Sequence, residues 1–233
     1  MIYEFTATTP EEKSIFDNRL KICERWSKLT TLTTKDIYRK RENNFLDTKK
    51  MIQQHAHSKM GEFLIQKFLE SKNIKIKEGT DFKIYCNENE IKDLLKLDPG
   101  AKNLLITTKN KDFSYDMVLE RYNLHIKIQD NESRNKLGVA SWVHQIGDSF
   151  LNRIIPEKDV SVLGYLDVVK RNFIIEWMVY THQIKKFDLL QSLLNGNKTK
   201  KAIYATSPKY TYRKNIAEEI DKGNITPLTL EQL

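Results

Sequence analysis

The spacing of hydrophobic residues along the chain changes near residue 75. Before that point apolar positions recur every three or four residues, most clearly at Met60, Phe63, Leu64, Phe68 and Leu69, which is typical of an amphipathic helix. The pattern predicts helices over 9–28, 33–44 and 47–71. Thr9 followed by Pro10 is a helix-start signal. The first 75 residues are therefore predicted to be entirely helical.

After residue 75 short apolar runs with strand character predominate, separated by helical segments. Strands are expected over 81–86, 103–109, 114–121, 123–130, 160–169, 172–184 and 201–206. Helices are expected over 89–97, 140–153 and 187–194. The order predicts an α/β (α+β) fold with a central mixed β-sheet flanked by helices. We divide the chain into a helical N-terminal extension (1–46), a core (47–184) and a basic C-terminal region packed on that core (185–233).

Composition narrows the function classes. The 233 residues include 39 Lys and Arg against 31 Asp and Glu, a net charge of +8 that favours a polyanionic partner such as nucleic acid. No run approaches the roughly 18 apolar residues of a membrane span, and the N-terminus lacks a secretory signal pattern. Cys23 and Cys86 match no metal or redox spacing, so reduced thiols in a cytoplasmic protein are expected. Phosphate-binding and dinucleotide-binding glycine motifs are missing from the sequence.

Two strands joined by a tight turn carry the candidate chemistry. With the turn at Tyr122-Asn123, Glu120 would face His125, Val118 would face Lys127, and Asp116 would face Gln129. One face of this hairpin is then apolar and must be core: Met117, Leu119, Leu124, Ile126 and Ile128. The other face gathers a carboxylate, a lysine, an imidazole and an amide. Phosphodiester hydrolysis uses such a set, because a carboxylate holds a divalent cation and a lysine orients the attacking water.

This arrangement resembles the PD-(D/E)XK superfamily, the restriction-endonuclease-like nucleases, over roughly residues 50–180. The resemblance makes Asp116 the motif aspartate and Lys127 the motif lysine. It assigns the upstream glutamate to Glu62, on the polar stripe Lys59, Glu62 and Gln66 of the helix 47–71. The segment SWVHQ (141–145) would begin the helix that follows the motif strand, with Gln145 pointing back at the site.

His125 departs from the pattern, since Asp or Glu is expected at its position. Imidazole is a poor ligand for Mg²⁺ but acceptable to Mn²⁺ or Zn²⁺. Three explanations are open: Glu62 or Glu120 supplies the missing carboxylate, His125 ligates the metal or acts as a base, or the site has lost catalysis and kept binding. We favour the first.

The resemblance implies a Mg²⁺-dependent (or Mn²⁺-dependent) endonuclease acting on double-stranded DNA in restriction or in phage or bacterial DNA processing. Asp116 and Glu62 would hold the metal with a main-chain carbonyl, Lys127 would position the water, and His125 and Gln129 would shape the pocket. A homodimer is implied, because many members cut both strands. The residues expected to contact nucleic acid are Gln145, Lys59, Lys198, Lys200, Lys201, Lys209, Arg213 and Lys214.

Several other residues and two other functions also fit parts of the sequence. His55 and His57 lie two apart on a helix and point to different faces, so a metal site there is disfavoured. Asp167 and Glu176, each in an apolar strand, are read as paired or solvated carboxylates rather than as ligands. Two alternative functions stay open: an inactive nucleic-acid-binding module of the same fold, and a protein-interaction factor without affinity for DNA.

Overall fold

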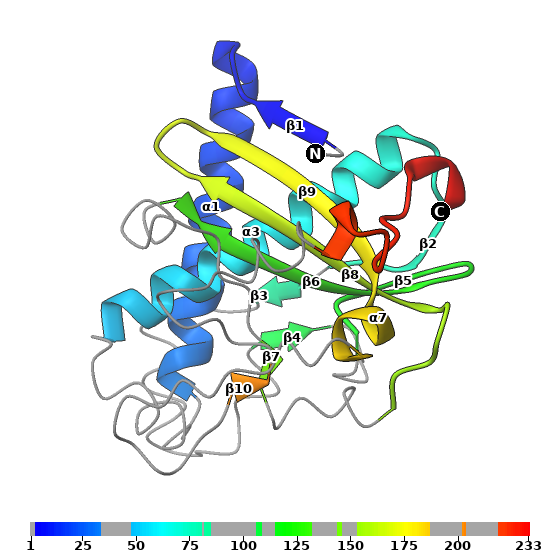
Figure 1. Ribbon diagram of the computed structural model, residues 1–233. Helices are drawn as coiled ribbons and strands as arrows, with labels where there is room; N and C mark the ends of the chain where they lie inside the picture. Colours follow the sequence, from blue (N-terminus) through cyan, green and yellow to red (C-terminus); the bar gives the residue numbers. More distant parts are fainter. Residues whose placement is uncertain are drawn as a thin grey trace.

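The computed structural model describes residues 3–33, 48–80, 82–84, 106–108, 115–131, 144–145, 153–186, 202–203 and 219–233. Six strands form one mixed sheet in the order β1-β9-β8-β6-β5-β2, and two helices pack on it (Figure 1). The helices are α1 (Pro10–Thr33) and α3 (Thr48–Ser71). The strands of this sheet are β1 (Tyr3–Thr6), β2 (Ile76–Glu78), β5 (Met117–Leu119), β6 (Asn123–Asp130), β8 (Asp159–Asp167) and β9 (Asn172–Tyr180).

Short elements complete the described chain. Two small ladders pair β3 (Phe82–Ile84) with β4 (Ile106–Thr108) and β7 (His144–Gln145) with β10 (Ala202–Ile203). Helix α7 (Thr181–Lys186) follows β9 directly, and a 3₁₀ turn, η2 (Leu230–Gln232), lies near the C-terminus. The mixed α/β class is confirmed. The division into three segments stays a prediction, although β1 and α1 belong to the same sheet and core as the rest.

Strand β6 has a different neighbour relationship on each side. It pairs antiparallel with β5 through a tight turn and parallel with β8 along its whole length, from Asn123↔Asp159 to Asp130↔Leu166. A parallel pair cannot be joined by a tight turn, so the chain must return to the same end of the sheet between β6 and β8. Among the elements of this sheet, α3 is therefore followed by the antiparallel strands β2, β5 and β6 and then by β8, parallel to β6.

Most predicted elements are found close to their expected positions. The start of α1 is confirmed: the Thr9 hydroxyl accepts the Glu12 N–H at 3.1 Å, and the Glu12 carboxylate accepts the Thr9 N–H at 3.0 Å, which is a capping box. The helices expected over 89–97 and 187–194, and that over 33–44 beyond Thr33, lie outside the described residues.

Two predictions about the ends of the sheet were wrong. The first 75 residues are not all helical, because β1 pairs with β9 from Tyr3↔Ile175 to Thr6↔Asn172. The strand expected over 172–184 ends at Tyr180, and the chain turns into α7, where Thr181 is buried and shares a 2.9 Å hydrogen bond with Ser161 of β8.

The core lies between the α1–α3 pair and one face of the sheet. The apolar face predicted for the hairpin is confirmed, since its members pack in this core together with residues of α3. At the closest approach, a Cβ added to Gly61 of α3 would lie 2.4 Å from Cγ1 of Ile128. The same Ile128 side chain packs against Gly164 of β8, where an added Cβ would also meet a backbone oxygen at 2.5 Å. Glycine at position 61 thus sets how closely α3 approaches β6.

We expect Gly61→Ala to lower the free energy of unfolding by about 1–2 kcal/mol. Overpacking costs about 1–3 kcal/mol, which exceeds the gain of up to about 1 kcal/mol that Ala brings to a helix interior. Denaturant unfolding measures the effect. Gln54→Ala, at an exposed position of the same helix, is the control. In an Ile128→Ala background, Gly61→Ala should cost less stability than in the wild type, because the side chain that the added Cβ would meet is gone. An equal cost in both backgrounds would contradict the contact.

Candidate functional site

The β5–β6 hairpin has a different register from the one the sequence predicted. The Leu119 N–H donates to the Tyr122 carbonyl at 2.8 Å, so the tip of the turn is Glu120-Arg121 rather than Tyr122-Asn123. The physical reason is burial: Tyr122 and Asn123 are 7% and 4% exposed, and the Asn123 amide donates to Asp159 at 2.8 Å. Residues held in the core in this way cannot form an exposed tip.

This correction moves Glu120 away from His125. Glu120 is exposed in the turn, and its carboxylate pairs with Lys75 at 2.7 Å, which holds the pKa of Glu120 below its usual range. Glu120 therefore does not supply the carboxylate that the nuclease motif lacks at position 125. The tip moves by two residues, an even number, so the side chains within β5 and β6 keep the faces that alternation had assigned. Asp116, which precedes β5, is the exception, because its carboxylate acts on Lys59 of α3.

Asp116 lies where β5 and β6 separate. The described ladder between them pairs Met117 with Leu124 and Val118 with Asn123, whereas β6 continues beside β8 to Asp130. The Asp116 N–H donates to the Leu124 carbonyl at 3.0 Å, and its Oδ2 accepts the Ile126 N–H at 2.7 Å. Asp116 thus lies opposite His125 rather than Gln129, and its side chain takes the place of a strand carbonyl at this fork.

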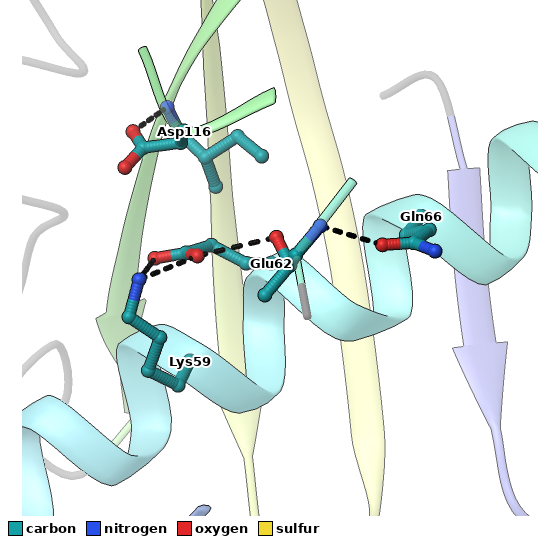
Figure 2. A network of polar contacts seen from close by, with 6 residues as sticks. Lys59, Glu62, Gln66 and Asp116 are labelled. Atoms are coloured by element: carbon teal, nitrogen blue, oxygen red, sulfur yellow. Dashed lines mark hydrogen bonds and ion pairs between the residues drawn. The ribbon is translucent and has the colours of Figure 1, made fainter. Parts of the chain in front are cut away.

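Glu62 is a buried carboxylate on α3, 2% exposed. Both of its oxygens accept hydrogen bonds from the Lys59 ammonium, at 2.8 Å (Oε1) and 2.7 Å (Oε2), one helical turn earlier. The Thr80 hydroxyl also donates to Oε2, at 3.2 Å. The Thr80 N–H in turn donates to Gln66 Oε1 at 2.7 Å, so the polar stripe of α3 is attached to the chain just after β2 (Figure 2).

Lys59 connects the two carboxylates electrostatically. Burial lowers the pKa of the Lys59 ammonium, but the negative charges of Glu62 and Asp116 outweigh it, so the pKa of Lys59 lies above its ordinary value. Figure 2 shows the carboxyl groups of Asp116 and Glu62 on the same side of the view, with Lys59 reaching toward Glu62. The structure therefore brings together Glu62, Asp116 and Lys59.

The remaining hairpin residues lie on the opposite face of β6. Ile128 faces α3, and Ile126 shares its face, so alternation turns His125, Lys127 and Gln129 away from that helix. The His125 imidazole is 2% exposed and packs near the Tyr115 ring, with centroids 5.3 Å apart. Gln129 is 8% exposed and Lys127 is half-buried. The ammonium that contacts Glu62, a candidate metal ligand, is therefore that of Lys59 and not that of Lys127.

Gln145 was wrongly placed in a helix over 140–153. It lies in β7, where His144–Gln145 pairs with Ala202–Ile203, and this ladder takes up its backbone hydrogen bonds in place of a helical turn. The basic residues expected to contact nucleic acid from the C-terminal region lie outside the described residues: Lys198, Lys200, Lys201, Lys209, Arg213 and Lys214.

The other acidic and histidine candidates have structural roles or no metal-site neighbours. Asp167 ends β8, accepting hydrogen bonds from the Asn131 amide at 2.7 Å and the Lys170 N–H at 2.9 Å. The buried Glu176 carboxylate accepts a hydrogen bond from the Tyr165 hydroxyl. Across the described part of the chain, no group of three or more His, Cys, Asp or Glu side chains is suited to hold a metal ion, His55 and His57 included.

The donor set at the fork fits a hard divalent cation. Mg²⁺ is usually bound by one or two carboxylates together with waters and substrate phosphate oxygens, so two carboxylates suffice. Asp116 and Glu62 are the residues that would hold it. Thr80 was missed because nothing in the sequence links it to a glutamate 18 positions earlier. The Lys59–Glu62 pair could have been found from its i, i+3 spacing.

Comparison with known proteins gives no relative from which a function could be inferred, so any function has to be argued from the geometry of the site. No family model matches the chain, and neither the curated proteins nor the solved structures contain a match. In the ranges the structure describes, no helix has both the length and the apolar character needed to cross a membrane.

Replacing Asp116 separates its structural role from its charge. Asp116→Ala removes the acceptor of the Ile126 N–H, and we expect it to lower the free energy of unfolding by about 1–2 kcal/mol. Asp116→Asn keeps a carbonyl oxygen and should stay within about 0.5 kcal/mol of the wild type. Thermal and denaturant unfolding measure both. Glu120→Ala, which breaks only an exposed ion pair, is the control. Equal stability of Asp116→Ala and the control would contradict this role.

Proposed function

We propose that the protein is a metal-dependent endonuclease that hydrolyses phosphodiester bonds in DNA, with a restriction-endonuclease-like core. The observation that carries the proposal is the buried Glu62 carboxylate on α3 beside Asp116, at the point where β5 and β6 separate. A carboxylate that is 2% exposed is costly unless it serves a site or a partner, and here it lies near a second carboxylate and an ammonium.

The chain order supports the proposal. A helix bearing the glutamate precedes the hairpin, Asp116 stands just before the first hairpin strand, and β8 follows, parallel to the second. The helix, the hairpin and the position of Asp116 stand in the order that the resemblance to the PD-(D/E)XK nucleases implies, whereas the helix expected from SWVHQ (141–145) is replaced at His144–Gln145 by β7. The net charge of +8 is suited to a polyanionic substrate.

In this proposal each residue has a defined task. A bound Mg²⁺ or Mn²⁺ would neutralise the scissile phosphate and acidify a water molecule. Asp116 and Glu62 hold that cation through carboxylate oxygens, and Thr80 orients Glu62. The resemblance gives Lys127 the task of orienting the attacking water, but Lys127 lies with His125 and Gln129 on the other face of β6. In this proposal the ammonium beside the cation is therefore that of Lys59, and His125, Lys127 and Gln129 support β6 from its other face. Gln145, Lys59 and the C-terminal lysines and arginine contact the nucleic acid. Double-stranded DNA as substrate, a homodimer and a cytoplasmic location complete the proposal.

A second candidate function rests on a specific observation. Lys59 already neutralises Glu62, and Asp116 already satisfies the Ile126 N–H, so both carboxylates have partners without a metal. The same residues are therefore compatible with a nucleic-acid-binding module that has lost catalysis.

Cleavage of supercoiled plasmid with Mg²⁺, Mn²⁺ or EDTA distinguishes these functions. We expect metal-dependent nicking or cutting in the wild type, and a loss of about a hundredfold or more in Asp116→Asn and Glu62→Gln. Glu70→Gln is a matched control for Glu62→Gln, because Glu70 pairs with Lys67 at the same i, i+3 spacing on α3 but is exposed.

Other results point elsewhere. Salt-sensitive DNA binding without cleavage of plasmid, single strands or RNA under any metal would overturn the enzyme and leave the binding module. The absence of any salt-sensitive DNA affinity would overturn both and favour a protein-interaction factor.

A further inference from the structure

Lys59 holds the Glu62 carboxylate by both oxygens. The distances from Nζ are 2.8 Å to Oε1 and 2.7 Å to Oε2, and the Lys59 side chain is 23% exposed against 3% for Glu62. The Asp116 carboxylate acts on the same ammonium. One ammonium therefore pairs with Glu62 and is also attracted by Asp116, the two residues that would ligate a metal.

A divalent cation at these carboxylates has to compete with that ammonium. Two cations on one carboxylate repel each other strongly where solvent is largely excluded, as it is around Glu62. The long lysine side chain can move, whereas Glu62 is fixed by Thr80. Lys59 also has another favourable surface within reach, since its Nζ lies 5.4 Å from the centroid of the Trp26 ring on α1.

We propose that Lys59 is a built-in counter-ion of the Glu62–Asp116 pair that competes with the divalent cation, so that metal binds only as the ammonium leaves Glu62. The inference rests on the proposed metal site and adds how occupancy of that site is controlled. It gives the protein weaker metal affinity than two carboxylates alone would have. The displaced Lys59 ammonium would then lie beside the cation, where it can form an ion pair with an anionic phosphate.

Binding of Mn²⁺ to the full-length protein tests the inference without any activity assay. Titration calorimetry, or the electron paramagnetic resonance signal of free Mn²⁺, gives the dissociation constant at one fixed pH and ionic strength. We expect Lys59→Gln to bind Mn²⁺ about tenfold more tightly than the wild type, because the competing charge is gone. Lys59→Arg keeps the charge and should bind no more tightly than the wild type.

Lys67→Gln is the matched control. Lys67 pairs with Glu70 at 2.6 Å with the same spacing on α3, but this pair is exposed. Its dissociation constant for Mn²⁺ should stay within about twofold of the wild-type value. The double variant Lys59→Gln/Asp116→Asn should lose the tight binding, which assigns the gain to this site. Circular dichroism of each variant establishes that it is folded.

The outcomes separate the inference from the proposed function. Equal or weaker Mn²⁺ binding in Lys59→Gln, with measurable binding in the wild type, would overturn the counter-ion and leave the metal site. Tighter binding in Lys59→Arg would overturn it as well, and this holds even if Lys59→Gln does not fold. No Mn²⁺ binding in either the wild type or Lys59→Gln would overturn the metal site and the inference together.

Discussion

The Glu62 carboxylate must be compensated in the folded protein, because it is almost fully removed from water. Lys59 provides that compensation from one turn earlier in the same helix, so no other element has to supply the positive charge. Thr80 then ties the pair to the segment that leaves β2, and Asp116 adds a second negative charge from the start of β5. Helix α3, the end of β2 and the β5–β6 hairpin thus meet around the buried Glu62 carboxylate.

The position of this charge depends on a contact made by the neighbouring residue. Gly61 allows α3 to lie against Ile128, and Gly164 leaves room for the same side chain on β8. A larger residue at position 61 would push the helix away from β6 and move Glu62 with it. The packing of α3 is therefore part of the geometry of the site, although neither Gly61 nor Ile128 takes part in its chemistry.

Asp116 combines two roles that a single substitution can confuse. Its oxygen takes the place of a strand carbonyl for the Ile126 N–H, which stabilises the fork between β5 and β6. Its negative charge acts on Lys59. An alanine at this position removes both, whereas an asparagine removes the charge alone. The second variant is the informative one for function.

Local pattern predicted much of the fold, because periodicity reports which face of an element is buried. The range of β6, the long helix α3 and the apolar face of the hairpin followed from spacing alone. Strand β2 also had a readable signal, the alternation of Ile74 and Ile76 with Lys75 and Lys77, which was overlooked. The hairpin register could not be read, because the burial of Asn123 depends on Asp159 from a distant strand.

In the candidate site, too, local spacing predicted some residues, whereas others depend on how distant elements pack. Glu62 and Lys59 share a helical stripe that the sequence displays directly. Their proximity to Asp116 depends on how α3 crosses the sheet, and the partner Thr80 depends on where β2 ends. Lys127 appeared to belong beside Asp116 when only the hairpin was considered. The packing of Ile128 on α3 shows that alternation turns Lys127 to the other face.

The central claim is that Glu62 and Asp116 together hold a divalent cation. Anomalous diffraction from crystals of the full chain grown or soaked with Mn²⁺ tests it most directly, because it locates the metal without relying on turnover. The account predicts an anomalous peak within coordination distance of a carboxylate oxygen from each residue, with the Lys59 ammonium displaced from Glu62. A structure with an intact Lys59–Glu62 pair, and with Mn²⁺ bound only elsewhere or not at all, would contradict it.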